Sequence, residues 1–184
     1  DVADVKDHSS GREGMRLVDV NEILDVSLTL IEAQLQERSV QVVREGPERL
    51  PWVFAISNHL KQVCFNLIFN AADAMPEGGQ LRVRSYVAAA GDGGDGAGYV
   101  SVSGGRGAEL AGPAVVVEIS DTGTGIPAQE LPKIFEPFYT TRVKGTGLGL
   151  AVSYSIIEQH HGELAVRSVE GEGTTFRIRL PVAQ

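Results

Sequence analysis

The sequence is poor in cysteine and in long hydrophobic runs, and each shortage excludes a class of protein. The single cysteine among 184 residues, Cys64, cannot form an internal disulfide. It lies in an apolar helical stretch, so we expect it to be a small core residue. No apolar run approaches the roughly 20 residues that span a bilayer, and no basic-then-apolar leader opens the chain. We therefore expect a cytoplasmic domain without direct membrane contact.

Basic residues are also scarce. The chain has 16 Lys and Arg against 24 Asp and Glu, a formal net charge of -8, whereas nucleic-acid binders present basic surfaces to phosphate. We expect no nucleic-acid partner. The length suits one well-cored domain, which we expect over residues 17–184, after an aperiodic polar tail over residues 1–16.

Hydrophobic periodicity predicts helices in three places. Asp19 followed by Glu22 is typical of a capping box, and it opens a helix up to about residue 38. Apolar residues then recur at helical spacing at Leu24, Leu28, Ile31 and Leu35. A second helix is expected over 58–75 after a Ser57 cap, and a third over 148–161.

Strand patterns lie between these helices. Alternating or β-branched runs predict strands over 40–45, 52–56, 80–87, 114–121, 163–169 and 173–181. We interpret residues 88–113 as a flexible Gly-rich insertion in which only the stretch 99–103 resembles a strand. This mixed order predicts an α+β fold, a two-layer sandwich with helices on one face of a sheet.

The first candidate site is a pair of asparagines on the second predicted helix. Asn66 and Asn70 are four residues apart, so their carboxamides share one helical face. An amide oxygen suits Mg²⁺, which keeps most of its waters and accepts few protein ligands. The alternative is two polar residues on a solvated face, although Asn is a poor helix former and needs a reason there.

The second candidate directly follows the strand over 114–121. Asp121, with Gly123 and Gly125 after it, places a carboxylate beside an open backbone turn. A carboxylate only accepts hydrogen bonds, so it suits the exocyclic amine of adenine and leaves guanine's oxygen unpaired. The alternative is a tight Asp-Thr-Gly turn without a ligand.

Two more glycine-rich segments follow. The run KGTGLGL precedes the third predicted helix, so its backbone N–H groups and the positive helix end can surround an anion. The candidate anion-binding residues are Arg142, Lys144, Gly145, Thr146, Gly147, Leu148 and Gly149. The spacing is neither that of a Walker A loop nor that of the Rossmann fingerprint. The run GEGTTF, residues 171–176, leads into the last strand and could equally be an ordinary hairpin turn.

Taken together and in this order, the segments resemble the catalytic and ATP-binding domain of bacterial sensor histidine kinases. That superfamily also includes gyrase and ATPases of the chaperone and repair types. The family's N, G1, F, G2 and G3 boxes correspond to residues 66–70, 121–125, 135–138, 145–149 and 171–174. The resemblance covers about residues 17–181, interrupted by the insertion. The stretch FEPFYTT is similar to the branch whose response regulators activate transcription.

The resemblance implies a Bergerat-type fold that binds ATP and Mg²⁺ between the helices and the sheet. It implies Asn70 as the Mg²⁺ ligand, Asn66 as its phosphate-side neighbour and Asp121 as the reader of adenine. Gly125 and Ile126 would pack near the base.

The resemblance further implies a support and a lid for the nucleotide. Thr175 would support a water network on the adenine side. The segment from residue 138 to 147 would be the ATP lid, in which glycines permit closure while Arg142 and Lys144 follow the phosphate charge.

Two positions depart from the family pattern. ATP-hydrolysing relatives have a glutamate where this chain has Asn66, an amide without useful basicity, so we expect slow hydrolysis and transfer to a protein acceptor. Many members have a lysine one turn after the magnesium asparagine, where this chain has Asp73. Asp73 either weakens a phosphate contact or turns toward the metal's waters, and both interpretations stay open.

The chain offers no histidine in the context of a phosphoacceptor. We interpret His8, His59, His160 and His161 as structural or surface residues. The resemblance therefore implies a monomeric fragment whose partners are a histidine-bearing dimerisation domain of the same parent protein and a response regulator. The alternatives are an ATPase of the chaperone or repair type and a degenerate module that only senses nucleotide.

Overall fold

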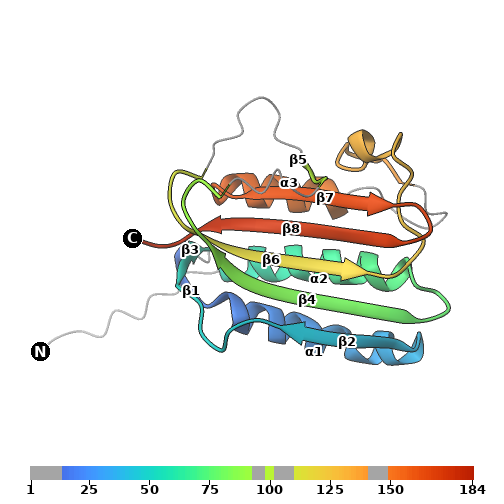
Figure 1. Cartoon of the computed structure of the whole chain (residues 1–184). Coiled ribbons are helices and arrows are strands. Elements are labelled where there is room, and N and C mark those ends of the chain that lie inside the picture. The colour runs from blue at the N-terminus through green and yellow to red at the C-terminus, as the bar shows by residue number, and fades with distance from the viewer. Residues whose placement is uncertain (1–13, 93–97, 102–109, 141–148) are drawn as a thin grey trace, which may run out of the picture.

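A sheet and a layer of helices make up the fold (Figure 1). The computed structural model describes residues 14–92, 98–101, 110–140 and 149–184. Within this part of the chain the helices are α1 (Val20–Glu37), α2 (Ser57–Asp73), α3 (Gly149–Gln159) and the short 3-10 helix η2 (Leu131–Lys133). The strands there are β1 (Arg16–Val18), β2 (Val40–Glu45), β3 (Val53–Ala55), β4 (Gly79–Ala88), β5 (Val100–Ser101), β6 (Ala114–Asp121), β7 (Glu163–Val169) and β8 (Gly173–Pro181).

In the described residues, the strands form a two-stranded sheet, β1-β3, and a six-stranded sheet with the order β2-β4-β6-β8-β7-β5. In the larger sheet β2 runs parallel to β4, and the other neighbouring pairs are antiparallel. Figure 1 shows α1, α2 and α3 side by side behind this sheet. The predicted α+β sandwich, with a mixed, mostly antiparallel sheet and helices on one face, is confirmed.

The alternation along β4 explains why the helices cover one face of the sheet. Leu81, Val83 and Ser85 are buried, whereas Arg82 and Arg84 between them are exposed. Burying the apolar side of each strand against the helices is the main favourable term in forming the two layers. None of the helices in the described residues is long and apolar enough to cross a bilayer.

The helix predictions hold with one correction, at the start of α2. Asp19 caps α1 as expected, and its carboxylate accepts from the backbone N–H of Asn21 at 2.9 Å. Ser57 is not the cap of α2, because it is the first helical residue and is buried. The N-cap is Ile56, which has no capping side chain and whose backbone N–H donates instead to Nε2 of His160 at 3.0 Å.

The predicted tail, residues 1–16, overlaps the fold at its last residue, Arg16. Arg16–Val18 form β1, which the sequence did not indicate because only Val18 of its three residues is buried. β1 pairs with β3 in antiparallel register, with Leu17 opposite Phe54.

The prediction that Cys64 is a core residue is confirmed. Its side chain is 4% exposed, and burial raises the pKa of its thiol to about 12.

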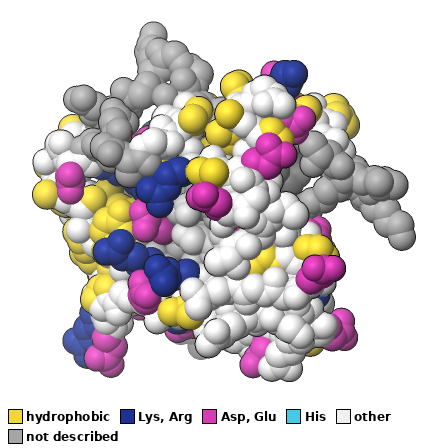
Figure 2. Space-filling view, turned by 45° about the vertical axis from the view of Figure 1, so that its right-hand side comes forward, with side chains coloured by type: hydrophobic (Ala, Val, Ile, Leu, Met, Phe, Trp, Pro, Cys, Tyr) yellow, Lys and Arg dark blue, Asp and Glu magenta, His cyan; other side chains and the backbone are white. Residues whose placement is uncertain are grey.

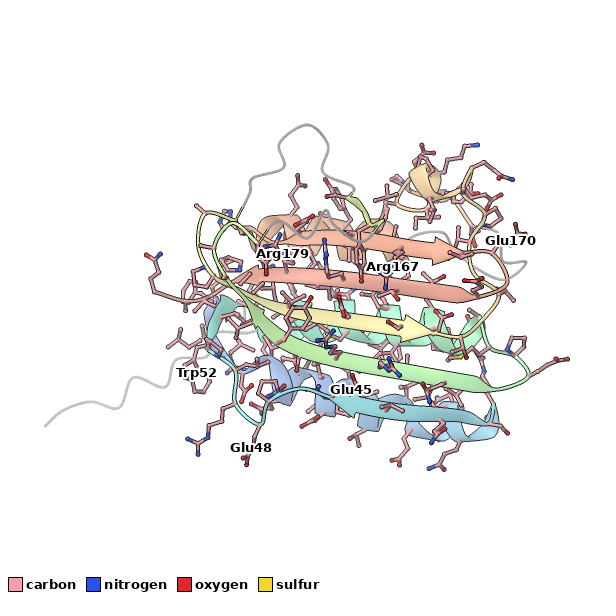
Figure 3. The ribbon with its side chains drawn as sticks, in the orientation of Figure 1. Glu45, Glu48, Trp52, Arg167, Glu170 and Arg179 are labelled. Atoms are coloured by element: carbon pink, nitrogen blue, oxygen red, sulfur yellow. The ribbon has the colours of Figure 1, made fainter. Side chains whose placement is uncertain are left out.

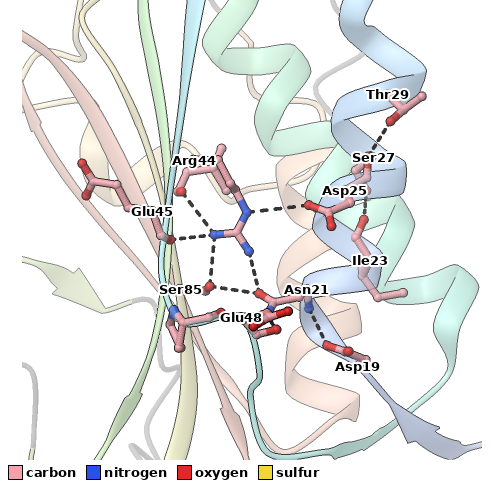
Figure 4. Close-up of polar contacts among 12 residues, drawn as sticks. Asp19, Asn21, Ile23, Asp25, Ser27, Thr29, Arg44, Glu45, Glu48 and Ser85 are labelled. Atoms are coloured by element: carbon pink, nitrogen blue, oxygen red, sulfur yellow. Dashed lines mark hydrogen bonds and ion pairs between the residues drawn. The ribbon is translucent and has the colours of Figure 1, made fainter.

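An arginine ties the start of α1 to the sheet (Figure 4). Arg44 of β2 donates from Nη2 to Oδ1 of Asn21 at 2.6 Å and from Nη1 to Oγ of Ser85 at 3.1 Å. Asn21 in turn donates from Nδ2 to the carbonyl oxygen of Glu48 at 3.2 Å. Burial lowers the pKa of Arg44, and the nearby carboxylate of Asp25 opposes that shift.

Part of the predicted insertion is fastened to the outer face of the sheet. Its strand-like stretch forms β5, which pairs with β7 at the sheet edge, and residues 93–97 and 102–109 lie outside the described residues. The ring of Tyr99 lies 4.8 Å from the guanidinium carbon of Arg167 and 4.0 Å from that of Arg177. Its hydroxyl donates to Glu118 at 3.1 Å. Basic and acidic side chains gather together on this face (Figures 2 and 3).

Candidate functional site

The buried end of β6 carries the carboxylate that the sequence singles out. Asp121 is in phase with Ile119, so its side chain points to the helical side of the sheet, and it is 9% exposed. It accepts hydrogen bonds from the backbone N–H of Gly123, at 2.9 Å, and from that of Thr174. Burial is the largest influence and raises the pKa of Asp121, while the two backbone donors oppose it.

The turn after Asp121 packs directly on the C-terminal end of α2. The backbone N–H of Thr124 donates to the carbonyl oxygen of Ala74 at 3.1 Å. A Cβ at Gly123 would lie 2.3 Å from that same oxygen, so only glycine permits this approach. The predicted base-reading turn and the helix of the paired asparagines therefore meet.

The other side of the same turn packs on the hairpin between β7 and β8. Gly125 has a φ of +69°, and a Cβ there would lie 2.1 Å from the carbonyl oxygen of Val169. Ile126, partly buried against the core, donates from its backbone N–H to Oγ of Ser168 at 2.8 Å. The glycine-rich turn after β6 and the one between β7 and β8 thus lie together.

The paired asparagines lie beside the start of α3. Nδ2 of Asn66 is 3.4 Å from the carbonyl oxygen of Gly149 and 3.4 Å from Oγ of Ser153. Asn66 and Asn70 are both half-buried on the same side of α2, as their spacing predicts. The N box and the last glycine of the G2 box therefore come together.

Most of the predicted anion-binding segment lies outside the described residues. These residues are Arg142, Lys144, Gly145, Thr146, Gly147 and Leu148. Before it, the F box is anchored by Phe135, whose buried ring lies 6.3 Å from that of Phe176 and 6.2 Å from that of Tyr154. Phe138 is 75% exposed and has a φ of +66°, an unusual backbone conformation for a bulky residue.

The location of Thr175 does not fit the role predicted for it, support of a water network beside adenine. Thr175 pairs with Ser120 across β8 and β6, and their hydroxyl oxygens are 2.8 Å apart. Both residues are out of phase with Ile119 and Phe176, which belong to the core. Thr175 therefore lies on the outer face of the sheet, away from Asp121.

The residue that does lie beside Asp121 is Thr174. It is 5% exposed, its backbone N–H bonds to Asp121, and its Oγ1 is 2.8 Å from Oγ of Ser168. The sequence alone could have indicated this, because Thr174 is two residues before Phe176 and so lies on the same side of the strand.

Asp73 makes a contact that neither sequence interpretation included. Its Oδ1 accepts a 2.5 Å hydrogen bond from Nη1 of Arg38, which follows the end of α1. This ion pair joins α1 to α2 at the turn of helix after Asn70.

Among the described histidines, His160 is structural, as expected. It is 3% exposed, its Nδ1 is 2.7 Å from the carbonyl oxygen of Ile156, and its Nε2 accepts from Ile56. The ring of His59 lies 6.0 Å away, edge to face. His8 lies outside the described residues.

Comparisons with known proteins agree with this geometry. Residues 55–184 match the family described as histidine kinase-, DNA gyrase B-, and HSP90-like ATPase. The sensor histidine kinase ZraS of Escherichia coli K12 is 34% identical over 91% of this chain, which spans 31% of that protein. The sensor kinase CckA of Brucella abortus is 40% identical over 94% of the chain, which spans 18% of it.

Solved structures share the fold. The catalytic domain of histidine kinase ThkA, in a nucleotide-free form, has a TM-score of 0.70 and 27% identity, and the match covers 91% of this chain and 95% of that one. The chain spans about a third or less of the length of the relatives named above. Because the family match covers most of the chain, from β3 to the last residue, the chain belongs to the family of histidine kinase-, DNA gyrase B- and HSP90-like ATPases.

Proposed function

We propose that this chain is the ATP-binding catalytic domain of a sensor histidine kinase. ATP binds between α2, α3 and the sheet, with adenine at Asp121 and the phosphates toward Asn66 and Gly149. The observation that carries this proposal is the buried carboxylate of Asp121, held by backbone donors where the turn after β6 packs between the end of α2 and the turn after β7. A carboxylate in that setting can accept from the amine of adenine.

We propose Asn70 as the protein ligand of Mg²⁺. An amide oxygen is a fitting donor for this ion, which takes its other ligands from phosphate oxygens and water. In the described part of the chain no group of three or more His, Cys, Asp or Glu could hold a metal, in keeping with a site completed by the nucleotide. When bound, Mg²⁺ neutralises phosphate charge during transfer.

The reaction is transfer of the γ-phosphoryl group to a histidine on a separate dimerisation domain. The histidine nitrogen attacks the γ-phosphorus in line, and ADP leaves. This chain's residues orient the nucleotide and exclude water, since catalysis of this reaction rests mainly on positioning and charge. Asn66 has no basicity to activate water, which favours transfer over hydrolysis.

The biological setting follows from the same proposal. The histidine-bearing domain belongs to the parent protein, and a response regulator receives the phosphoryl group from that histidine. The chain works in the cytoplasm, where ATP is available. Contacts of the phosphates with residues 142–148 remain predictions, because these residues are outside the described part of the chain.

A reconstituted transfer assay tests the function. The chain is mixed with Mg²⁺, γ-labelled ATP and a separately supplied dimerisation domain, and a matched sample carries that domain with its histidine replaced by glutamine. Acid-labile label on the domain that is lost in the glutamine sample supports the proposal. Free phosphate as the main product indicates an ATPase, and nucleotide binding without either product indicates a sensing module, so each of these outcomes contradicts it.

A further inference from the structure

An ion pair joins the C-terminal ends of α1 and α2. Nη1 of Arg38 donates to Oδ1 of Asp73 at 2.5 Å, and the two side chains are 33% and 23% exposed. The guanidinium carbon of Arg38 also lies 5.9 Å from the centre of the Phe69 ring, on α2. The Arg38 backbone N–H donates to the carbonyl oxygen of Gln34 at 3.2 Å, so the arginine projects from a fixed helix end.

The carboxylate of this ion pair, Asp73, lies on the face of α2 that carries the paired asparagines. Asp73 follows Asn70 by three residues and Asn66 by seven, so the three side chains share one face of the helix. The next residue, Ala74, accepts the hydrogen bond from Thr124 in the turn after Asp121. Asp73 therefore lies between the asparagines and the base-reading turn.

A carboxylate at that place opposes the ligand of the proposed function. ATP with bound Mg²⁺ keeps a net negative charge, and like charges near a protein surface repel one another over several ångströms. An arginine in hydrogen-bond contact cancels most of that field, because a guanidinium stays charged at any relevant pH.

We propose that Arg38 is a positioning residue that neutralises Asp73 and so permits a triphosphate to bind along this face of α2. This inference rests on the proposed function. Arg38 acts through Asp73 and need not touch the nucleotide. Its loss weakens the binding of charged nucleotides and leaves adenosine binding unaltered.

A double-mutant cycle tests the inference, with affinities for Mg²⁺–ATP and adenosine measured by NMR titration of the labelled chain. Arg38→Ala should weaken ATP binding about 3- to 10-fold, and Asp73→Asn should not weaken it. The double variant should return to within about twofold of the parent, since removing both charges restores neutrality. Arg38→Lys, which keeps the charge, should stay close to the parent.

Arg82→Ala is the matched control. It removes an arginine that pairs with Glu45 at 3.5 Å on the outer face of the sheet, so it changes net charge equally without touching Asp73. It should leave ATP affinity unchanged.

Three results overturn the inference. A double variant as weak as Arg38→Ala means that Arg38 acts independently of Asp73. A parallel loss of adenosine affinity means that the ion pair only holds the fold. A parent chain that binds neither ligand refutes the proposed function itself, and the inference with it, whereas the first two results leave that function standing.

Discussion

The backbone N–H of Gly171 donates a 2.7 Å hydrogen bond to the carbonyl oxygen of Thr124, which joins two glycine-rich turns that are more than forty residues apart in the chain. One turn follows Asp121 and the other connects β7 to β8. Because the first turn also bonds to Ala74 of the segment after α2, the three elements fix the surroundings of the Asp121 carboxylate. The stability expected for variants at Gly125 and Asp121 rests on this arrangement.

Gly125→Ala tests the close approach of the two turns. Its φ of +69° and the 2.1 Å separation between an added Cβ and the carbonyl oxygen of Val169 force the backbone to shift. We expect a loss of about 1–3 kcal/mol in the free energy of unfolding, measured by urea denaturation, together with weaker ATP binding. Gly112→Ala is the control, since a Cβ there meets no atom within 4 Å. Equal stability of the two variants would contradict the contact.

The buried carboxylate predicts a stability that depends on pH. Burial raises the pKa of Asp121 in the folded state, so the folded chain holds this proton more tightly than the unfolded chain does. Its favourable contribution is therefore present at low pH and is lost as the pH rises through the raised pKa. At pH 7 Asp121→Asn should be at least as stable as the parent, and its advantage should vanish on acidification toward about pH 4. The measurement is thermal unfolding of both proteins across this pH range. An Asp121→Asn variant that is less stable than the parent at pH 7 would contradict the prediction.

His160→Ala should destabilise the junction of α2 and α3. The substitution removes the acceptor of the Ile56 N–H and the ring nitrogen that lies 2.7 Å from the Ile156 carbonyl oxygen, both at a residue only 3% exposed. We expect a cost of about 1–3 kcal/mol in chemical denaturation, because buried polar groups lose their partners. Gln159→Ala, at an exposed neighbouring position, should cost little. A His160 variant as stable as that control would show that these bonds contribute nothing.

Substitutions at Tyr99 should affect the stability of the chain and not its nucleotide binding. Tyr99→Phe should cost about 0.5–1.5 kcal/mol through the lost hydrogen bond to Glu118, and Tyr99→Ala should cost more because the ring contacts with Arg167 and Arg177 also go. Neither variant should alter ATP affinity, since the ring lies on the outer face of the sheet. Denaturation and nucleotide titration are the measurements, and a fall in ATP affinity at unchanged stability would contradict this separation.

The sequence predicted the elements whose burial follows a regular period. β2, β6, β7 and β8 have the predicted bounds, because their alternating or β-branched residues indicate strands by themselves. β1 was missed because three residues with a single buried side chain carry no period. Ser57 was misassigned because capping residues are common at helix starts, whereas here a buried His160 receives the backbone N–H before the helix.

The candidate site was predictable in part. The boxes containing Asp121 and Asn66 could be found, since each is a local pattern of residue types. The prediction of Thr175 did not take the phase of β8 into account, although the core residue Phe176 defines that phase. The Arg38–Asp73 ion pair joins residues 35 positions apart, so it depends on how α1 packs on α2 and no local pattern reveals it.

Calorimetric titration of Mg²⁺–ATP into the parent chain and into Asp121→Asn tests the central claim most directly. Asparagine keeps the size of the side chain, but its NH2 group would face the exocyclic amine of adenine, and both are donors. Because the buried acceptor is lost, the affinity for ATP should fall at least tenfold. The account predicts saturable binding by the parent and a sharp loss in a variant whose thermal stability at pH 7 is undiminished. Equal affinity of the two proteins, or no binding by the parent, would contradict it.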